Sequence, residues 1–253
     1  MTESPLGSGN RSPASLPVFD LGVAPYEPLQ ALQGRLRQAV ADGLVAGVLL
    51  LLEHEPVITL GSRGTDGDLR LSAGRGRNAS GDAARELWGR LTSIPVVRSE
   101  RGGQATLHAP GQLVSYPVVP VPDHDLGKYV RGLEECLIVV LREHGIHADR
   151  RPRHPGLYVS GDKIASVGLR CQKWVASHGT SLNVTVDLTL FDSIVSCGEA
   201  TLRQTSMESL LGERFSMAGV KDAYCRAFAD VFGWRVAPTR RVVFSEVEKE
   251  LGL

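Results

Sequence analysis

Lysine is scarce in this chain: five of its 28 basic residues are lysines and the other 23 are arginines. A lysine inside a dense motif therefore carries more weight, because arginine cannot replace it where an amine must lose a proton. An excess of either charge is also missing, since 28 basic residues face 28 acidic ones. No global field is therefore available to attract nucleic acid or an anionic membrane.

Paired cysteines and long apolar runs are missing as well. The four cysteines lie far apart with no C-x-x-C pair, which argues against a zinc site, a thioredoxin-like pair or a secreted disulfide framework. The Ser/Pro/Gly-rich opening lacks the apolar core of a signal peptide. The longest apolar stretch, Leu44–Leu52, is too short for a membrane span, which needs about 20 residues. We expect a cytoplasmic protein with reduced thiols and neither metal nor cofactor.

The overall pattern predicts one folded domain of the α/β class. Hydrophobic residues make up 42% of the 253 and charged ones 22%, as in an ordinary globular enzyme. Residues 1–17 are predicted to form a flexible tail, and residues 18–253 the domain. Strands and helices mix without strict alternation, which favours a mixed β-sheet flanked by helices. Arg63–Ala84, rich in Gly, Arg, Asp and Ser, is predicted to be a long surface excursion.

Apolar periodicity places the elements along the chain. Helices are predicted at Glu27–Asp42, Asp125–His144, Met217–Phe232 and Ser245–Leu251. Strands are predicted at Leu44–Glu53, Val57–Leu60, Pro95–Ser99, Gln104–His108, Gln112–Val118, Leu157–Val159, Lys163–Arg170 and Thr180–Val186.

One cysteine has neighbours that suit a nucleophile. Cys197 follows the apolar pair Ile194-Val195 and precedes Gly198, a pattern that predicts a strand end entering a turn. Nucleophiles favour such turns because backbone N–H groups there can receive an oxyanion. The alternative is a small buried hydrophobic side chain, which is our interpretation of Cys136 and Cys225 in their helical patterns.

Lys163 opens the apolar run that ends at Gly168. A lysine at the mouth of a buried strand is partly desolvated, whereas a solvated surface position is the alternative. A phosphate loop is rejected, because Asp162 and Ile164 break the required Gly-Lys-Ser/Thr sequence. A thiol beside an amine is the minimal equipment for acyl transfer, since positive charge favours the thiolate.

Three glycine-containing segments suit ligand binding. Arg101-Gly102-Gly103-Gln104 offers a cation and two permissive glycines, or alternatively a hairpin turn with a solvated arginine. His108 precedes a Pro-Gly turn that would hold it rigidly, although a histidine merely flanking a surface turn fits equally well. His178-Gly179-Thr180-Ser181 is similar in character. Neither histidine has partners at metal-binding spacing.

Five blocks in order resemble the lipoyl(octanoyl) transferase family. They are HEPVITLG, RGGQATLHAPGQ, GDKIASVG, HGTSLN and the cysteine before glycine at 197, spread from about Glu53 to about Leu211. The resemblance implies the α/β catalytic fold shared by biotin and lipoate protein ligases, so that residues 18–253 form an acyltransferase catalytic domain.

By this resemblance, Cys197 carries an acyl thioester and Lys163 promotes ionisation of its thiol. Substrate would bind along three segments that line the acyl and pantetheine channel. These comprise Arg101, Gly102, Gly103, Gln104, Ala105, Thr106, Leu107 and His108, then Ser166, Val167 and Gly168, and finally Gly179, Thr180 and Ser181.

The sequence departs from the family at three positions. The family usually has an aromatic residue before the histidine and a glycine after it, where this chain has Leu107 and Ala109. Proline commonly precedes the cysteine, where this chain has Ser196. These changes leave the preferred length of the acyl chain open.

The resemblance implies transfer of octanoyl, a medium-chain acyl group, from octanoyl-acyl carrier protein to a lysine of a lipoyl domain, the first step of endogenous protein lipoylation. The acceptors implied are the E2 subunits of 2-oxoacid dehydrogenases and the glycine cleavage H protein. The acceptor amine must arrive neutral, so Lys163 or the departing thiolate accepts a proton. The alternatives are an ATP-dependent lipoate or biotin ligase, which has no use for Cys197, and a non-catalytic acyl-carrier-binding module.

Overall fold

The computed structural model describes residues 15–70 and 89–253. Its main sheet has the strand order β11-β1-β2-β6-β10-β9-β8-β7. In chain order these strands are β1 Val18–Ala24, β2 Val48–His54, β6 Gln112–Val118, β7 Asp149–Arg151, β8 His154–Val159, β9 Asp162–Gln172, β10 Val175–Asn183 and β11 Arg240–Arg241. Strand β1 is parallel to β2 and β11, whereas the remaining pairs are antiparallel. The predicted mixed sheet is confirmed.

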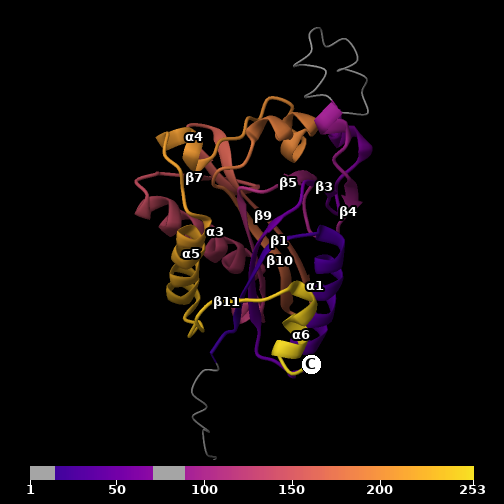
Figure 1. Ribbon diagram of the computed structural model, residues 1–253, viewed down its shortest axis with the longest axis vertical. Helices are drawn as coiled ribbons and strands as arrows, with labels where there is room; N and C mark the ends of the chain where they lie inside the picture. Colours follow the sequence, from indigo (N-terminus) through magenta and orange to yellow (C-terminus); the bar gives the residue numbers. More distant parts are fainter. Residues whose placement is uncertain (1–14, 71–88) are drawn as a thin grey trace, which may run out of the picture.

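Helices cover both faces of this sheet (Figure 1). On one side lie α3 (Leu126–Glu143) and α5 (Met217–Phe232), which pack on each other. On the other side lie α1 (Tyr26–Ala41) and the short α6 (Val247–Glu250). A further short helix, α4 (Met207–Leu211), precedes α5. The predicted arrangement of a sheet flanked by helices is therefore confirmed.

Strand β2 shows how one sequence supplies both layers. Successive side chains on a strand point to opposite faces. Leu49 and Leu51 accordingly join the core beneath α3 and α5, while Leu50 and Leu52 join the core beneath α1. Buried on both faces, the strand reads as an unbroken apolar run rather than as an alternating one.

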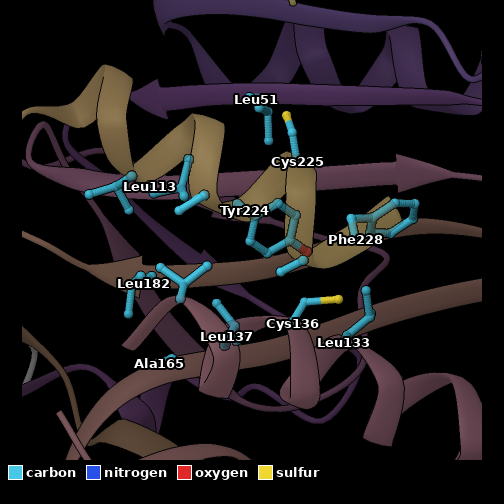
Figure 2. Close-up of a cluster of buried hydrophobic side chains, with 14 of the residues drawn as sticks. Leu51, Leu113, Leu133, Cys136, Leu137, Ala165, Leu182, Tyr224, Cys225 and Phe228 are labelled. Carbon is cyan, nitrogen blue, oxygen red and sulfur yellow. The ribbon is translucent and has the colours of Figure 1, made fainter. Parts of the chain in front are cut away.

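The core on the α3 and α5 side is closed by aromatic and sulfur side chains. Figure 2 shows Tyr224 and Phe228 of α5 pointing towards Leu133 and Leu137 of α3. Both helices present one apolar stripe, and helices that pack this way derive most of their stability from burying that stripe. The long helix predicted at Asp125–His144 is confirmed as α3, which Asp125 caps by accepting a hydrogen bond from the Lys128 N–H.

A second, three-stranded sheet lies beside the main one, in the order β4-β3-β5. Its strands are β3 Val57–Leu60, β4 Val96–Arg98 and β5 Ala105–His108. It packs on the irregular segment that follows β10, where two short 3₁₀ helices, η4 (Leu188–Ser193) and η5 (Ser196–Gly198), occur. A third, η1 (Asp66–Asp68), follows β3.

Several boundaries differ from the sequence-based predictions. Strand β10 begins five residues before the predicted Thr180 and ends before Val186. Strands β1, β7 and β11 were not predicted, because each is paired by partners distant in sequence or is very short. Leu16 is buried and bridges Val236, so the folded part begins before the predicted boundary at residue 18. Residues 1–14 of the predicted tail, and residues 71–84 of the predicted excursion, lie outside the described residues.

Candidate active site

A cavity of about 350 Å³ opens between the sheet and the segments that follow β4 and η4. Its walls contain every site residue predicted from the sequence except Leu107. The loop before β5 supplies Arg101 to Gln104, β9 supplies Ser166 to Gly168, and β10 supplies Gly179 to Ser181. Because β9 and β10 pair with Gly168 opposite Gly179, segments distant in sequence form one continuous wall.

Lys163 lies in β9 and is almost fully buried, with 3% of its surface exposed. Its Nζ donates to Cys197 Sγ at 3.1 Å and to the carbonyl oxygen of Pro155 at 3.3 Å. The same Nζ lies 5.3 Å from the centre of the Tyr158 ring, within range of a cation–π interaction. The amine is thus held at a fixed place against the thiol, and the predicted solvated alternative is wrong.

Cys197 belongs to η5 rather than to the end of a strand. Its backbone has a φ of 56° and a ψ of 19°, the left-handed region that residues other than glycine rarely adopt. The preceding segment makes only a single β-bridge, from Ile194 to Leu69. The predicted strand end is therefore wrong, while the predicted turn is present. Unusual backbone of this kind concentrates at functional sites.

The other three cysteines do not line the cavity. Cys136 and Cys225 are buried in the core beneath α3 and α5, as predicted. Burial raises the pKa of both thiols, and it raises the pKa of Cys171 as well. All four cysteines are free. Cys197 is therefore the thiol that the fold brings to an amine and a cavity.

Leu107 does not belong to the cavity wall. It is fully buried in the core of the smaller sheet. Its neighbours in β5, Thr106 and His108, face the cavity instead. The physical reason is the alternation of side chains along a strand, which excludes one residue of an otherwise continuous predicted block.

Arg101 is buried and braces its own loop. Its guanidinium donates to Thr59, through both the carbonyl oxygen and Oγ1, and to the carbonyl oxygens of Gly102 and Gln104. Burial lowers the pKa of Arg101 from its ordinary value. The predicted alternative of a solvated arginine in a hairpin turn is wrong, because the side chain ties β3 to the glycine-rich loop.

Three buried histidines gather at the cavity and behind it. His108 contacts Gln112 Oε1 at 2.7 Å, and His54 contacts the Tyr116 hydroxyl at 2.7 Å. Burial lowers the pKa of His54 to about 4 and that of His178 to about 3, and it lowers the pKa of His108 well below its ordinary range. These rings are therefore neutral at physiological pH.

His178 and Tyr116 are cavity residues that the sequence did not assign. His178 has a φ of 56°, and its buried Nδ1 has no hydrogen-bond partner among the described residues. The HG-x-x-LN block pointed to this histidine without a role. Tyr116 gave no signal, because every residue of β6 is buried and no alternation marks the face that meets the cavity.

The cavity lining also includes residues outside every predicted block. They come from the start of α3, from the turn before β8 and the first two residues of β8, from β9 and from the segment after β3: Leu126 and Val130, Arg153 to Pro155, Leu169, and Arg63. Arg153 to Pro155 belong to the β7–β8 hairpin. They lie beside the cavity because β8 pairs with β9, which forms part of the cavity wall.

Within residues 15–70 and 89–253, no three His, Cys, Asp or Glu side chains gather closely enough to hold a metal ion. None of the helices in those two ranges combines the length and the hydropathy that a membrane crossing requires.

Comparison with known proteins shows relatives over most of the chain. An octanoyltransferase of Rubrobacter xylanophilus is 38% identical over 213 residues, which is 84% of this chain and 91% of the relative. One of Solibacter usitatus is 40% identical over 220 residues, covering 86% of this chain and 93% of the relative.

Solved structures share the fold at much lower identity. A lipoate-protein ligase A bound with ATP superposes with a TM-score of 0.68 at 16% identity, covering 94% of each chain. A bipartite lipoate protein ligase from Thermoplasma acidophilum has a TM-score of 0.66 at 16% identity, covering 94% of this chain and 92% of its own. The family model for the lipoyl protein ligase A/B catalytic domain matches residues 25–229. The chain therefore belongs to the lipoyl protein ligase A/B catalytic domain family.

Proposed function

We propose that this protein is an octanoyltransferase that moves an octanoyl group from acyl carrier protein to a lysine of a lipoyl domain. The observation that carries the proposal is the 3.1 Å contact between Lys163 Nζ and Cys197 Sγ at the wall of the cavity. The relatives that match most of the chain are named octanoyltransferases, which supports the same activity here. The four free cysteines suit a cytoplasmic protein.

In the first step the Cys197 thiolate attacks the carbonyl carbon of the acyl thioester. A new carbon–sulfur bond forms to Sγ, and the donor's thiolate leaves with the electrons of the old bond. The Lys163 ammonium, fixed beside Sγ, favours the thiolate over the thiol because opposite charges attract. Exchange between two thiols is close to isoenergetic, so this step needs no ATP.

In the second step the amine of the acceptor lysine attacks the carbonyl carbon of the acyl-enzyme. The carbon–nitrogen bond forms, the bond to Sγ breaks with its electrons staying on sulfur, and the proton that the amine loses passes to the departing thiolate or to Lys163. Amide formation from a thioester is downhill. The walls of β9, β10 and the Arg101–Gln104 loop would hold the acyl chain and exclude water from the thioester.

The ATP-dependent ligase remains the rival activity, because a ligase bound with ATP has the same fold. A ligase activates its acid as an adenylate. That chemistry needs no thiol nucleophile, so the contact between Lys163 and Cys197 would have no role in it. Low identity to the ligase structures speaks for a shared fold alone.

The test is intact-protein mass spectrometry after mixing with octanoyl-acyl carrier protein. The mass should rise by one octanoyl group in the presence of a chelator and without ATP, and addition of a lipoyl domain should discharge it. Cys197→Ser should abolish turnover, because a hydroxyl is a far weaker nucleophile at neutral pH. Cys171→Ser is the matched control, because Cys171 is a partly exposed cysteine that does not line the cavity. Absolute dependence on ATP and magnesium would favour the ligase.

A further inference from the structure

Tyr158 lies behind Lys163, on the neighbouring strand. The two residues are partners across β8 and β9, and Tyr158 is almost fully buried, with 2% of its surface exposed. Lys163 Nζ lies 5.3 Å from the centre of the Tyr158 ring, and Arg151 Cζ lies 4.7 Å from it, so two cations lie over one ring. Tyr158 does not line the cavity. Its influence on the reaction would therefore pass through the lysine rather than through contact with a substrate.

The hydroxyl of Tyr158 does not explain why a tyrosine stands here. Its oxygen is buried and has no hydrogen-bond partner among the described residues. A buried hydroxyl without a partner costs free energy relative to an apolar group of the same shape. The ring, in contrast, has two charged neighbours. Its face carries partial negative charge and attracts a cation within about 6 Å of the centre.

The amine of Lys163 has electron-rich neighbours but no carboxylate beside it. An ammonium has three N–H donors, and Nζ donates to the carbonyl oxygen of Pro155 and to Cys197 Sγ. It forms no ion pair with an Asp or Glu in the part of the chain that the structure describes. The Tyr158 ring is thus the third group that stabilises the buried charge.

Two carboxylates close to this pair in the sequence are bound by arginines instead. Asp162, which precedes Lys163, accepts a hydrogen bond from Arg203 Nε at 3.1 Å. Glu199, two residues beyond Cys197, lies 3.4 Å from Arg151 Nη1 through its Oε2. Arg151 therefore contacts both the Tyr158 ring and the acid nearest to the nucleophile.

A ring and a carboxylate would act differently on the reaction. A carboxylate beside Nζ would compete with the thiolate for the same positive charge. An aromatic ring stabilises a desolvated ammonium but bears no net charge. With a ring as its neighbour, the Lys163 ammonium keeps its attraction for the Cys197 thiolate.

We propose that Tyr158 is a positioning residue for Lys163, whose ring holds the ammonium against Cys197 Sγ. Because the ammonium acts on the acylation step, this role of Tyr158 rests on the proposed function. A ring with a weaker negative face leaves the amine less fixed and less often charged. The thiolate of Cys197 is then less favoured, so the thiol reacts at higher pH and acylation slows.

The experiment weakens the ring without changing its shape. Tyr158→Phe is compared with proteins that carry phenylalanine with one, two or three ring fluorines at position 158. Fluorine withdraws electron density from the face of the ring, so the attraction for a cation falls stepwise. The pH dependence of alkylation by iodoacetamide is followed on the peptide that contains Cys197. Acylation by octanoyl-acyl carrier protein is followed by intact mass.

The expected results separate the ring from the hydroxyl. Tyr158→Phe should keep the alkylation profile and the acylation rate of the unaltered protein, because it loses only an unpartnered hydroxyl. Each added fluorine should move the alkylation profile of Cys197 to higher pH. The trifluorinated ring should slow acylation by about tenfold, as expected when most of a desolvated cation–π contact is lost.

The matched control is the same series at Tyr129, another buried tyrosine whose hydroxyl has no partner among the described residues. Its ring packs on Phe232 in the core beneath α3 and α5, and fluorination there should leave the alkylation of Cys197 unchanged.

Three outcomes overturn the proposal: identical profiles throughout the Tyr158 series, a loss in Tyr158→Phe as large as in the trifluorinated protein, or an equal shift in the Tyr129 series. Absence of any acyl-enzyme in the unaltered protein overturns the proposed function instead, while the alkylation series still decides the role of the ring.

Discussion

The two reactive side chains are held in opposite ways. Lys163 lies in an eleven-residue strand that pairs with β8 and β10. Cys197 lies in a single turn of 3₁₀ helix with left-handed backbone, and its segment is tied down by isolated contacts such as Val195 N–H to the Asp68 carbonyl oxygen at 2.7 Å. The positively charged side chain, Lys163, is thus part of the sheet, whereas the nucleophile, Cys197, is part of a loop.

This difference suits the proposed chemistry. The ammonium must stay in place through both steps, because it serves the thiolate when that anion attacks and again when it leaves. The sulfur must accommodate a free thiolate, an acylated state and the intermediates between them. Scaffold elements position fixed groups with precision, whereas loops open and close at lower free-energy cost.

Removing the fixed charge should have the largest effect. Lys163→Ala should slow acylation by at least about 10²-fold, because a charge at about 3 Å contributes several kcal/mol even with strong screening. Alkylation of Cys197 should also require higher pH. The measurements are the acylation burst and the pH dependence of alkylation. An unchanged alkylation profile would remove the electrostatic role.

Lys163→Arg sharpens this result, since guanidinium keeps the charge but cannot give up its proton. Acylation should survive in part, because the positive charge beside Cys197 remains. Loss of transfer alone would identify Lys163 as the proton acceptor, and retained transfer would leave that role to the departing thiolate.

Disturbing the strand that supports Lys163 should come next. Gly156 has a φ of 125°, and an added Cβ would collide with the backbone carbonyl oxygen of Ala165 and lie 3.2 Å from Lys163 Nζ. Gly156→Ala should lower the free energy of unfolding by more than the about 1–3 kcal/mol of backbone strain alone, and it should slow acylation of Cys197. Gly161→Ala is the control, because its φ of 91° gives similar strain while nothing lies within 4 Å. Equal losses in urea unfolding would contradict the role of the close approach.

Acid should lower the free energy of unfolding because two buried histidines, His54 and His178, must bind protons. The folded-state pKa values of His54 and His178, about 4 and about 3, lie below the ordinary value. The unfolded chain therefore binds protons first, so stability is full above about pH 6.5 and is lost as pH falls. Each histidine should remove about 2 kcal/mol between about pH 8 and pH 5.

Urea unfolding at several pH values measures this loss. Asparagine tolerates the left-handed backbone at this position. In His178→Asn the free energy of unfolding should therefore fall by about 2 kcal/mol less between about pH 8 and pH 5 than in the unaltered protein. A slope identical to that of the unaltered protein would show that His178 ionises alike in the folded and unfolded chains.

A matching change on the loop side should have the smallest effect. Gly198 has a φ of 72°, and an added Cβ would lie 2.6 Å from the side-chain nitrogen of Gln104. That neighbour is the end of a flexible side chain and can move aside, so Gly198→Ala should cost about 1–2 kcal/mol from the backbone alone. Thermal unfolding compares it with Gly156→Ala. A larger loss at Gly198 would reverse the contrast between rigid strand and adaptable loop.

The sequence predicted best what local pattern determines. The bounds of β3 and β6 match those predicted, and α1, α3 and α5 fall at the predicted helical periodicities. The residues of the glycine-rich blocks, Arg101 to Gln104 and Gly179 to Ser181, lie in the cavity wall. The resemblance gave the order of these blocks, but it did not separate Leu107, which is buried in the core of the smaller sheet, from the other residues of β5.

What pattern could not supply came from contacts between distant segments. The left-handed backbone of Cys197 depends on packing against β5 and on contacts with the segment around Asp68. His154 Nδ1 lies 3.3 Å from Glu199 Oε1. This approach depends on the β7–β8 hairpin, whose three-residue strand β7 has no apolar pattern. Neither hydrophobic periodicity nor the residue types of turns predict such contacts between distant segments.

The backbone of Lys163 has a further consequence. Its N–H donates to the carbonyl oxygen of Arg203, and its own carbonyl accepts from Thr205 N–H, both at 2.9 Å. The chain leaving Cys197 is therefore fastened to Lys163 itself at Arg203, after five intervening residues, 198–202. A tether this short gives the amine a high effective concentration at the sulfur. The effective concentration of the Lys163 amine at the Cys197 thiol is thus set by the chain itself. It changes neither with dilution of the protein nor with the concentration of salt around it.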